Sequence, residues 1–314
     1  MDPEIAMSSP GVLGSIGDTP LIRLPSPAEE EDAEIWAKWE GANPTGSMKD
    51  RMALSMVEGA AKRGDLPPGG RVVEYTGGST GSSLAMVCAA KGYSAHLVSS
   101  DAFAEEKLRT MRAFGATLDI IPSENREITA ELIRAMIDRA GELAQEPGTF
   151  WTDQFNNVDN RRAYHAMAEE ILRNLPGHLD AFVTVAGTGG CFSGNVEVFK
   201  QEDDPPKCVA VQPATHKNLS GGPVGPHRIE GIGPGFVPKI MRMDLVDEIL
   251  SVANEDANET ARLLAAKAGV FGGISSGANV FAAQEVAHEL GPGHRVVTVL
   301  VDSGLKYLGQ EPYF

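Results

Sequence analysis

Short apolar runs alternate with amphipathic stretches from about residue 70 onward, and this alternation predicts strands followed by helices. Three runs have the length and the β-branched content of buried strands, namely 71–76 (RVVEYT), 94–100 (SAHLVSS) and 117–123 (TLDIIPS). Helical periodicity marks 82–92, 105–116 and 128–146, and glycine stands at or near the end of the first two, as it commonly does where helices stop.

The second half of the chain repeats the alternation. It predicts strands at 180–187, 207–213 and 295–301, and helices at 161–175, 254–269 and 278–290. Strands that alternate with helices imply right-handed crossovers and mainly parallel sheets with helices on both faces, which is an α/β fold. The 314 residues favour two lobes over one, and because no clear linker separates them, the lobes are expected to be intimately joined.

Glycine clusters lie where predicted strands end and helices begin. They are Tyr75–Gly81 (YTGGSTG), Ala186–Gly194 (AGTGGCFSG) and Gly272–Gly277 (GGISSG). Ligands of parallel sheets bind at the carboxyl ends of the strands, and small residues there expose backbone N–H groups to an anion. Three such loops predict a small-anion site, and the loop at 186–194 is the candidate for a phosphate.

Two alternatives apply to the loop at 186–194. A nicotinamide dinucleotide fingerprint fits poorly, because Phe192 stands where a third glycine is needed and the next strand ends at Gln212 instead of an acid. A purely structural turn is the other alternative. Cys191 lies within the loop, and we expect it to pack or to contact phosphate weakly, since a bound dianion opposes formation of a thiolate.

The segment NPTGSMKDR, residues 43–51, places a lysine at the start of a predicted helix. Ser47 could serve simply as an N-cap before solvated charges. A lysine at the start of a helix is nevertheless unusual, and Lys49 together with the three donor-rich loops favours a small-anion site.

The formal net charge of −16 argues against partners that are nucleic acids or anionic membranes, because both attract basic proteins. Cys88, Cys191 and Cys208 are odd in number and far apart, which suits a reducing cytoplasm and not a disulfide framework. No signal peptide, membrane-spanning run or metal-ligand spacing is evident. We therefore expect a cytoplasmic protein with a small-molecule substrate and no metal.

Taken in order, these motifs resemble the cysteine synthase family of pyridoxal-phosphate enzymes, which includes O-acetylserine sulfhydrylases and the catalytic core of cystathionine β-synthases. Besides NPTGSMKDR and the three glycine loops, the resemblance covers IGDTPLIRL (Ile16–Leu24), QFNN and SGGPVGPHRIEGIGPGF. It implies fold type II, the tryptophan synthase β-like fold. The expected smaller mobile lobe is 45–150, carrying the substrate loop, and the expected larger lobe consists of 1–44 and 151–314.

The resemblance also implies a role for each motif residue. Lys49 would form a Schiff base with pyridoxal 5'-phosphate and act as the catalytic base. Other cofactor contacts would come from Ser79, Gly187, Thr188, Gly189, Gly190, Cys191 and Ser275, with Ser275 at the pyridine nitrogen. The substrate would be held by Thr76, Gly78, Ser79, Thr80 and Gln154, while Gly231 leaves room for it. Ser79, Gly77 and Cys191 stand where the family usually has Asn, Ser and Thr.

The activity implied by the resemblance is β-replacement on an O-activated L-serine (O-acetylserine or O-phosphoserine) through an aminoacrylate. Sulfide or another nucleophile then gives L-cysteine or another β-substituted alanine. Because the hydroxyl of Ser275 does not hold the ring nitrogen protonated, elimination or replacement is favoured over transamination. The alternatives are β-elimination of the serine dehydratase or cysteine desulfhydrase type, and a non-catalytic regulatory homologue. A homodimer is expected by resemblance.

Overall fold

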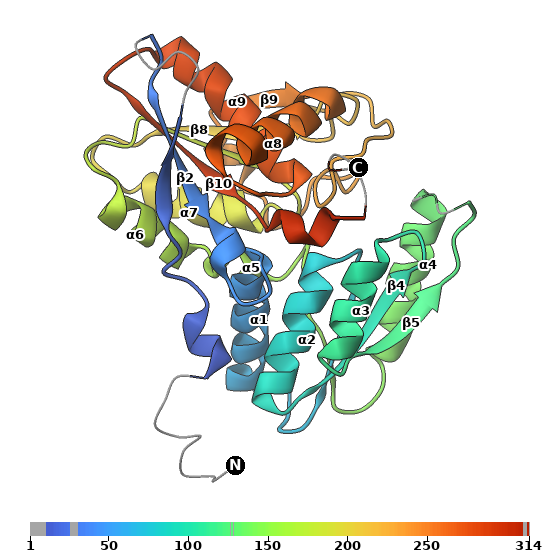
Figure 1. The fold of residues 1–314 in the computed structure, drawn as a ribbon. Helices are drawn as coiled ribbons and strands as arrows, with labels where there is room; N and C mark the ends of the chain where they lie inside the picture. The colour runs from blue at the N-terminus through green and yellow to red at the C-terminus, as the bar shows by residue number, and fades with distance from the viewer. Residues whose placement is uncertain (1–10, 26–30, 126, 128, 310–312, 314) are drawn as a thin grey trace. The chain divides into compact units, whose positions relative to one another are not determined.

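The computed structural model describes residues 11–25, 31–125, 127, 129–309 and 313 (Figure 1). Its residues form two compact units. The first unit takes in the described residues up to Ile16 together with Asn43–Asn160, and the second takes in Gly17–Ala42 together with the chain from Arg161 onward. Each unit contains one sheet, so the strands of the chain divide between two separate hydrogen-bonded networks.

The sheet of the first unit is parallel throughout, in the order β5-β4-β3-β6. Its strands are β3 (Arg71–Tyr75), β4 (Ser94–Ser100), β5 (Thr117–Ile121) and β6 (Thr149–Trp151). The helices are α1 (Lys49–Arg63), α2 (Ser79–Lys91), α3 (Glu105–Ala113) and α4 (Ala130–Leu143), with a 3₁₀ turn η2 (Val12–Ser15). The chain runs outward from β3 to β5 and then returns to β6. Right-handed crossovers therefore place α2 and α3 on one face and α4 on the other, as Figure 1 shows.

The sheet of the second unit has the order β1-β2-β10-β7-β8-β9, and its β1–β2 pair is antiparallel. Its strands are β1 (Leu21–Leu24), β2 (Glu34–Trp39), β7 (Ala181–Val185), β8 (Lys207–Pro213), β9 (Glu248–Val252) and β10 (Arg295–Leu300). The helices are α6 (His165–Asn174), α7 (Gly190–Phe199), α8 (Asn254–Ala268) and α9 (Ile274–Leu290). Short 3₁₀ turns are η3 (Glu40–Ala42), η4 (Met243–Leu245) and η5 (Gly304–Tyr307), and α5 (Val158–Arg162) contains the boundary between the units.

The predicted α/β class, with parallel strands between helices, is confirmed. One predicted helix, 161–175, is wrong as a single element. Residue 163 and Tyr164 separate α5 from α6, and the Tyr164 side chain is fully buried at this break. Packing of a large ring therefore decides the helix boundary, which periodicity did not reveal.

Two predicted turns are shorter than expected, because the helices that follow them begin earlier. Helix α2 begins at Ser79 and not at residue 82, so the turn after β3 contains little more than two glycines. Helix α9 begins at Ile274 and not at residue 278, which puts Ser275 in its first turn. In both places polar residues near a helix start appear as loop in the sequence and are helical in the structure.

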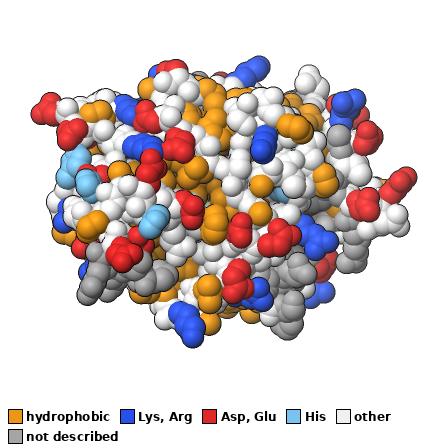
Figure 2. All heavy atoms as spheres, turned by 90° about the horizontal axis from the view of Figure 1, so that it is seen from above, with side chains coloured by type: hydrophobic (Ala, Val, Ile, Leu, Met, Phe, Trp, Pro, Cys, Tyr) orange, Lys and Arg blue, Asp and Glu red, His pale blue; other side chains and the backbone are white. Residues whose placement is uncertain are grey.

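On the face drawn in Figure 2, acidic side chains are spread among basic and hydrophobic ones, and basic side chains do not gather into one patch. Among the described residues, no helix has the length and apolar character needed to cross a membrane.

Candidate active site

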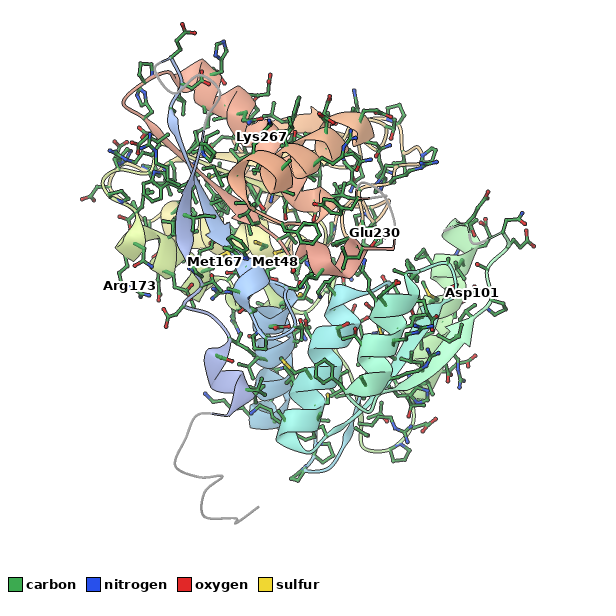
Figure 3. All side chains as sticks on the ribbon, viewed as in Figure 1. Met48, Asp101, Met167, Arg173, Glu230 and Lys267 are labelled. Atoms are coloured by element: carbon green, nitrogen blue, oxygen red, sulfur yellow. The ribbon has the colours of Figure 1, made fainter. Side chains whose placement is uncertain are left out.

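Lys49 is the first residue of α1, and its side chain is buried, with 9% of the residue exposed. Met48, labelled in Figure 3, occupies the N-cap position and makes no side-chain cap bond. The Ser47 hydroxyl instead accepts a hydrogen bond from the Lys49 N–H at 3.2 Å. The structure thus places a buried amine at a helix N-terminus, as NPTGSMKDR predicted.

Asp50 fixes the start of this helix. Its fully buried carboxylate accepts hydrogen bonds from the Thr45 N–H at 2.8 Å and the Thr45 hydroxyl at 2.5 Å. The Ser83 hydroxyl on α2 donates to the same carboxylate at 2.5 Å. Charge-assisted bonds of this kind are stronger than neutral ones. The Asp50 carboxylate therefore ties the start of α1, next to Lys49, to α2, the helix that begins in the candidate substrate loop.

The candidate substrate loop, Tyr75–Gly81, turns around Thr76 at the end of β3. Its hydroxyl oxygen accepts the N–H groups of Gly78 at 3.1 Å and Gly81 at 3.3 Å, and the Ser99 hydroxyl donates to its carbonyl oxygen at 2.7 Å. A Cβ atom at Gly77 would lie 2.5 Å from the Phe103 ring. The aromatic ring therefore occupies the space that the family's usual serine needs, which explains the glycine.

Gln154 and Thr80 lie together. The Thr80 hydroxyl donates to the Gln154 side-chain oxygen at 2.9 Å, and the Gln154 amide nitrogen donates to the Tyr75 carbonyl at 3.2 Å. Both residues are 6% exposed. Two residues that the sequence placed in different motifs, the substrate loop and QFNN, thus form one hydrogen-bonded group.

Glu74 is a residue of this region that the sequence analysis missed. It lies in β3 with no exposed surface, and burial raises the pKa of its carboxyl to about 7. Its carboxylate accepts the Gln154 N–H at 3.0 Å. The available signal was an acid in the otherwise apolar run VVEY, since buried acids are rare without a specific reason.

The candidate phosphate loop joins β7 to α7. Gly189 has φ +80°, a conformation that favours glycine, and a Cβ atom there would lie 2.8 Å from Met241. A Cβ atom at Gly187 would lie 2.1 Å from the carbonyl oxygen of Gly231, which itself has φ +84°. Close backbone approach therefore demands small residues here, and the predicted contact residue Gly231 packs on the phosphate loop.

The donors of this loop fit an anion. Helix α7 begins at Gly190, so its N-terminal N–H groups and its dipole favour negative charge at the loop. The Thr188 hydroxyl accepts the Gly190 N–H at 3.3 Å, and Thr188 and Cys191 are buried. Asn195, one turn later, donates to the Cys191 carbonyl at 2.8 Å.

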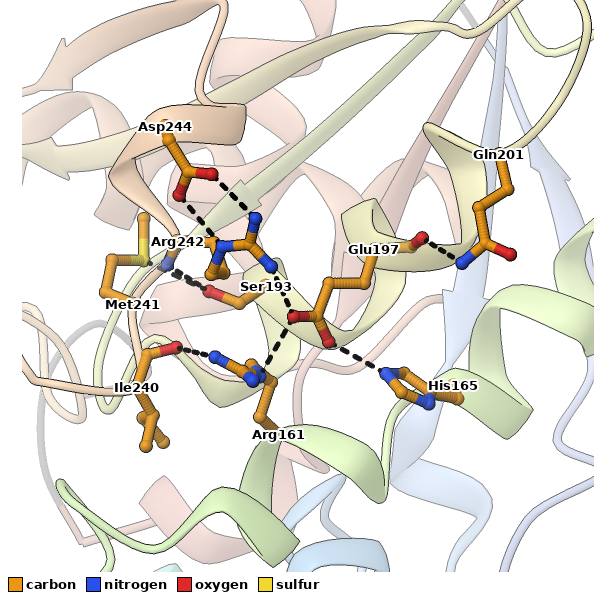
Figure 4. Close-up of polar contacts among 9 residues, drawn as sticks. All are labelled: Arg161, His165, Ser193, Glu197, Gln201, Ile240, Met241, Arg242 and Asp244. Atoms are coloured by element: carbon orange, nitrogen blue, oxygen red, sulfur yellow. Dashed lines mark hydrogen bonds and ion pairs between the residues drawn. The ribbon is translucent and has the colours of Figure 1, made fainter.

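Glu197 of α7 lies at the centre of a charged cluster with Arg161, His165 and Arg242 (Figure 4). The Glu197 carboxylate lies 2.8 Å from Arg242 Nη1, 3.2 Å from Arg161 Nε and 2.9 Å from His165 Nε2. Burial opposes ionisation, but the hydrogen bonds from His165 and Arg242 lower the pKa of Glu197 below its ordinary value. The Arg242 N–H also donates to the Ser193 hydroxyl at 2.9 Å, close behind the phosphate loop.

Ser275, the predicted partner of the pyridine nitrogen, is buried in the first turn of α9. The neighbouring Ser276 hydroxyl accepts the Val301 N–H at 2.9 Å. The Gly273 N–H donates to the Asp302 carbonyl at 3.2 Å. The segment after β10 therefore fixes the start of α9 and with it the Ser275 hydroxyl.

Residues 12–302 match the family described as "Pyridoxal-phosphate dependent enzyme". The chain belongs to this family. It is 39% identical over 300 residues to the cysteine synthase of Staphylococcus aureus, covering 95% of each chain. Among solved structures, O-acetylserine sulfhydrylase isoform 3 from Entamoeba histolytica is similar with a TM-score of 0.90 and 35% identity, covering 96% of this chain and 91% of that one. O-ureido-L-serine synthase is similar with a TM-score of 0.89 and 36% identity, covering 96% and 93%.

These comparisons confirm the recognised family, the fold type and the dependence on pyridoxal phosphate. The chain's own residues fit that cofactor: the Lys49 amine suits its aldehyde, the glycine-lined loop at the start of α7 suits its phosphate, and the Ser275 hydroxyl suits its ring nitrogen. The assignment of individual residues to these contacts stays a prediction.

Proposed function

We propose that the protein is a cysteine synthase, which replaces the acetoxy group of O-acetyl-L-serine by sulfide and releases L-cysteine and acetate. The observation that carries the proposal is a buried lysine at the first residue of a helix, in a chain 39% identical to a cysteine synthase over 95% of its length. A β-replacement enzyme of this type was predicted from the motifs.

Bound pyridoxal phosphate withdraws electrons from the α-carbon of an amino acid, which makes the α-proton acidic. The residue that takes this proton is Lys49, whose amine is buried and whose position is fixed by the Asp50 contacts with Thr45 and Ser83. The same amine returns a proton when the product forms. One buried amine serves both steps, because it gives back in the second the proton that it takes in the first.

The substrate carboxylate is bound by the loop that follows β3. Thr80 and Gln154 point their polar atoms at one another, and the Gln154 amide has a second N–H to offer to a carboxylate. The Thr76 hydroxyl uses its oxygen to hold the Gly78 and Gly81 N–H groups, which keeps the loop in one shape. Ser79, at the start of α2, would contact the 3'-oxygen of the cofactor ring.

Ser275 supports replacement over transamination. A hydroxyl at the ring nitrogen does not hold that nitrogen protonated, whereas a carboxylate would. The weaker electron withdrawal would favour loss of the leaving group over transamination. The phosphate would be held by Gly187, Thr188, Gly189, Gly190 and Cys191, and Gly231 would leave space for the amino acid.

The test mixes the protein, saturated with pyridoxal phosphate, with O-acetylserine, O-phosphoserine, serine and cysteine separately. We expect O-acetylserine to shift the visible absorbance of the cofactor, and sulfide to reverse the shift with formation of cysteine. Pyruvate release without sulfide, at a rate equal to turnover, would instead establish β-elimination. No response to any amino acid would favour the non-catalytic alternative.

The homodimer, expected by resemblance, and the cytoplasmic location, expected from the three cysteines, stay predictions. Light scattering of the purified protein measures its mass against the 33.3 kDa of one chain, and twice that mass is expected.

A further inference from the structure

Glu74 faces away from the core that its neighbours form. Val73 and Tyr75 pack in a cluster with Val98, Met136 and other apolar residues. Because side chains alternate along a strand, the Glu74 side chain leaves β3 on the opposite face, and its carboxyl still reaches Trp151 Nε1, whose ring packs against that cluster. Glu74 has no exposed surface, so a carboxyl group is held entirely inside the first unit.

Four donors converge on this carboxyl. They are the Tyr75 N–H at 3.0 Å and Trp151 Nε1 at 3.4 Å on one oxygen, and the Thr152 hydroxyl at 2.6 Å and the Gln154 N–H at 3.0 Å on the other. An ionised carboxylate accepts all four. When Glu74 is protonated, the Thr152 hydroxyl can accept the carboxyl O–H and donate to the Val73 carbonyl at 3.3 Å instead, so the bond donated by Thr152 to Glu74 belongs to the ionised form.

Stability alone does not account for this acid. Within the described part of the chain, the charged side chain that acts on Glu74 is Asp153, which repels it. A buried charge without an opposite charge costs free energy that an apolar side chain of similar volume would not cost.

The hydrogen bonds lead from Glu74 to the substrate loop. Glu74 holds the Gln154 backbone, the Gln154 side chain accepts from the Thr80 hydroxyl, and its amide donates to the Tyr75 carbonyl. The Asn160 side chain donates to the Gln154 carbonyl at 2.7 Å, which fixes the segment from its other side. The Glu74 carboxylate thus orders Gln154, the residue that links QFNN to the candidate substrate loop.

We propose that Glu74 is a positioning residue that holds Gln154, and through it Thr80, in the geometry that binds the carboxylate of the amino-acid substrate. The ligand in this proposal rests on the proposed function, whereas the hydrogen-bonded arrangement does not. Burial raises the pKa of Glu74 to about 7. Asp153 adds to the rise by repulsion, so the positioning is strongest above neutral pH.

The experiment compares wild type with Glu74→Gln, Thr152→Val and the control Glu146→Gln, all saturated with pyridoxal phosphate. Glu146 is exposed and pairs with Arg71 at the other end of β3, so its substitution is chemically matched. Thr152→Val removes one donor with little change of shape and serves if Glu74→Gln folds poorly. Two quantities are measured: amide hydrogen exchange of 76–81 and 152–157, and the half-saturating concentration of O-acetylserine in absorbance titrations at pH 6–9.

We expect Glu74→Gln to speed exchange in both segments by about tenfold and to raise half-saturation at pH 8 by about tenfold, while the rate at saturation changes less than about threefold. Thr152→Val should act in the same direction, and Glu146→Gln should match wild type. Wild type should bind O-acetylserine more weakly below pH 7, and Glu74→Gln should lose that dependence.

Each contrary result is decisive. Unchanged exchange in both Glu74→Gln and Thr152→Val would overturn the positioning role, whatever the substrate is. Faster exchange with half-saturation unchanged within twofold would overturn the link to substrate binding. If wild type responds to none of the amino acids, the proposed function fails, and the exchange data still decide whether Glu74 orders the two segments.

Discussion

The Thr80 hydroxyl donates to the Gln154 side-chain oxygen at 2.9 Å, although 74 positions separate the two residues in the chain. The bond exists because Thr80 lies in the first turn of α2, which follows β3, and Gln154 follows β6, the strand that pairs with β3. The carboxyl ends of adjacent parallel strands meet at one edge of a sheet, which is where ligands of such sheets bind. Two motifs predicted separately therefore act as one carboxylate-binding group in our proposal.

Lys49→Ala should abolish both covalent attachment of the cofactor and turnover. Loss of the amine removes the aldehyde partner and the base, so we expect the rate of cysteine formation to fall by about 10³-fold or more. Borohydride treatment followed by mass spectrometry should label the peptide that contains residue 49 in wild type and not in Lys49→Ala. Lys62→Ala, at an exposed position in the last turn of the same helix, should retain wild-type activity and label. Label retained in Lys49→Ala would assign the cofactor to another lysine.

Gly187→Ala should weaken cofactor binding. The added Cβ would lie 2.1 Å from the Gly231 carbonyl oxygen, and backbone on both sides must shift to relieve the overlap. We expect a loss of about 1–3 kcal/mol in the free energy of unfolding and about tenfold in cofactor affinity. Fluorescence titration with pyridoxal phosphate measures the affinity. Gly141→Ala, in α4, is the control, because the added Cβ would lie 3.8 Å from the Trp151 side chain, which is an ordinary van der Waals distance. If Gly187→Ala and Gly141→Ala bind pyridoxal phosphate equally tightly, the close approach of Gly187 to the Gly231 carbonyl is contradicted.

Glu197→Gln should loosen the helix that carries the phosphate loop. The substitution leaves Arg161 and Arg242 without the carboxylate they share, at a cost of about 2 kcal/mol in the free energy of unfolding at pH 7. Because the pKa of Glu197 is lowered in the folded state, its contribution is present above the unfolded pKa and is lost as the pH falls through the folded one. Urea unfolding at pH 3–7 should therefore show the deficit shrinking in acid. Glu259→Gln, in an exposed pair with Arg262, should stay within about 0.5 kcal/mol of wild type at every pH.

Glu74 should make the stability of the protein fall as the pH rises toward neutrality. Its folded pKa of about 7 lies above the ordinary value of 4.5 for a glutamate, so the folded state binds the proton more tightly than the unfolded state between these pH values. The stability of wild type relative to Glu74→Gln should therefore drop by about 3 kcal/mol from pH 4 to pH 8. Urea unfolding of both proteins measures the difference, with Glu146→Gln for comparison. A difference that does not change with pH would mean that Glu74 titrates normally.

The hydrophobic periodicity and the positions of the glycines predicted the main elements of the fold. Strands β3, β4 and β7 follow from short apolar runs, and helices α2 and α3 end at or near Gly92 and Gly115, since local backbone preference and burial act in the same direction there. Strand β6 has three residues and β1 has four, too few to show a period, so pairing with neighbours decides them. The break between α5 and α6 depends likewise on the buried ring of Tyr164.

Motif order in the sequence was enough to indicate the family, the cofactor and the candidate residues, because Lys49 and the glycine loops are defined by short contiguous stretches. The structure alone decided how those stretches are held in place. Phe103 excludes a side chain at Gly77, Glu197 gathers two arginines behind the phosphate loop, and Glu74 secures Gln154. These contacts join residues that are distant along the chain, and burial, which sets the pKa of Glu74 near 7, is a property of the packed protein and not of any local segment.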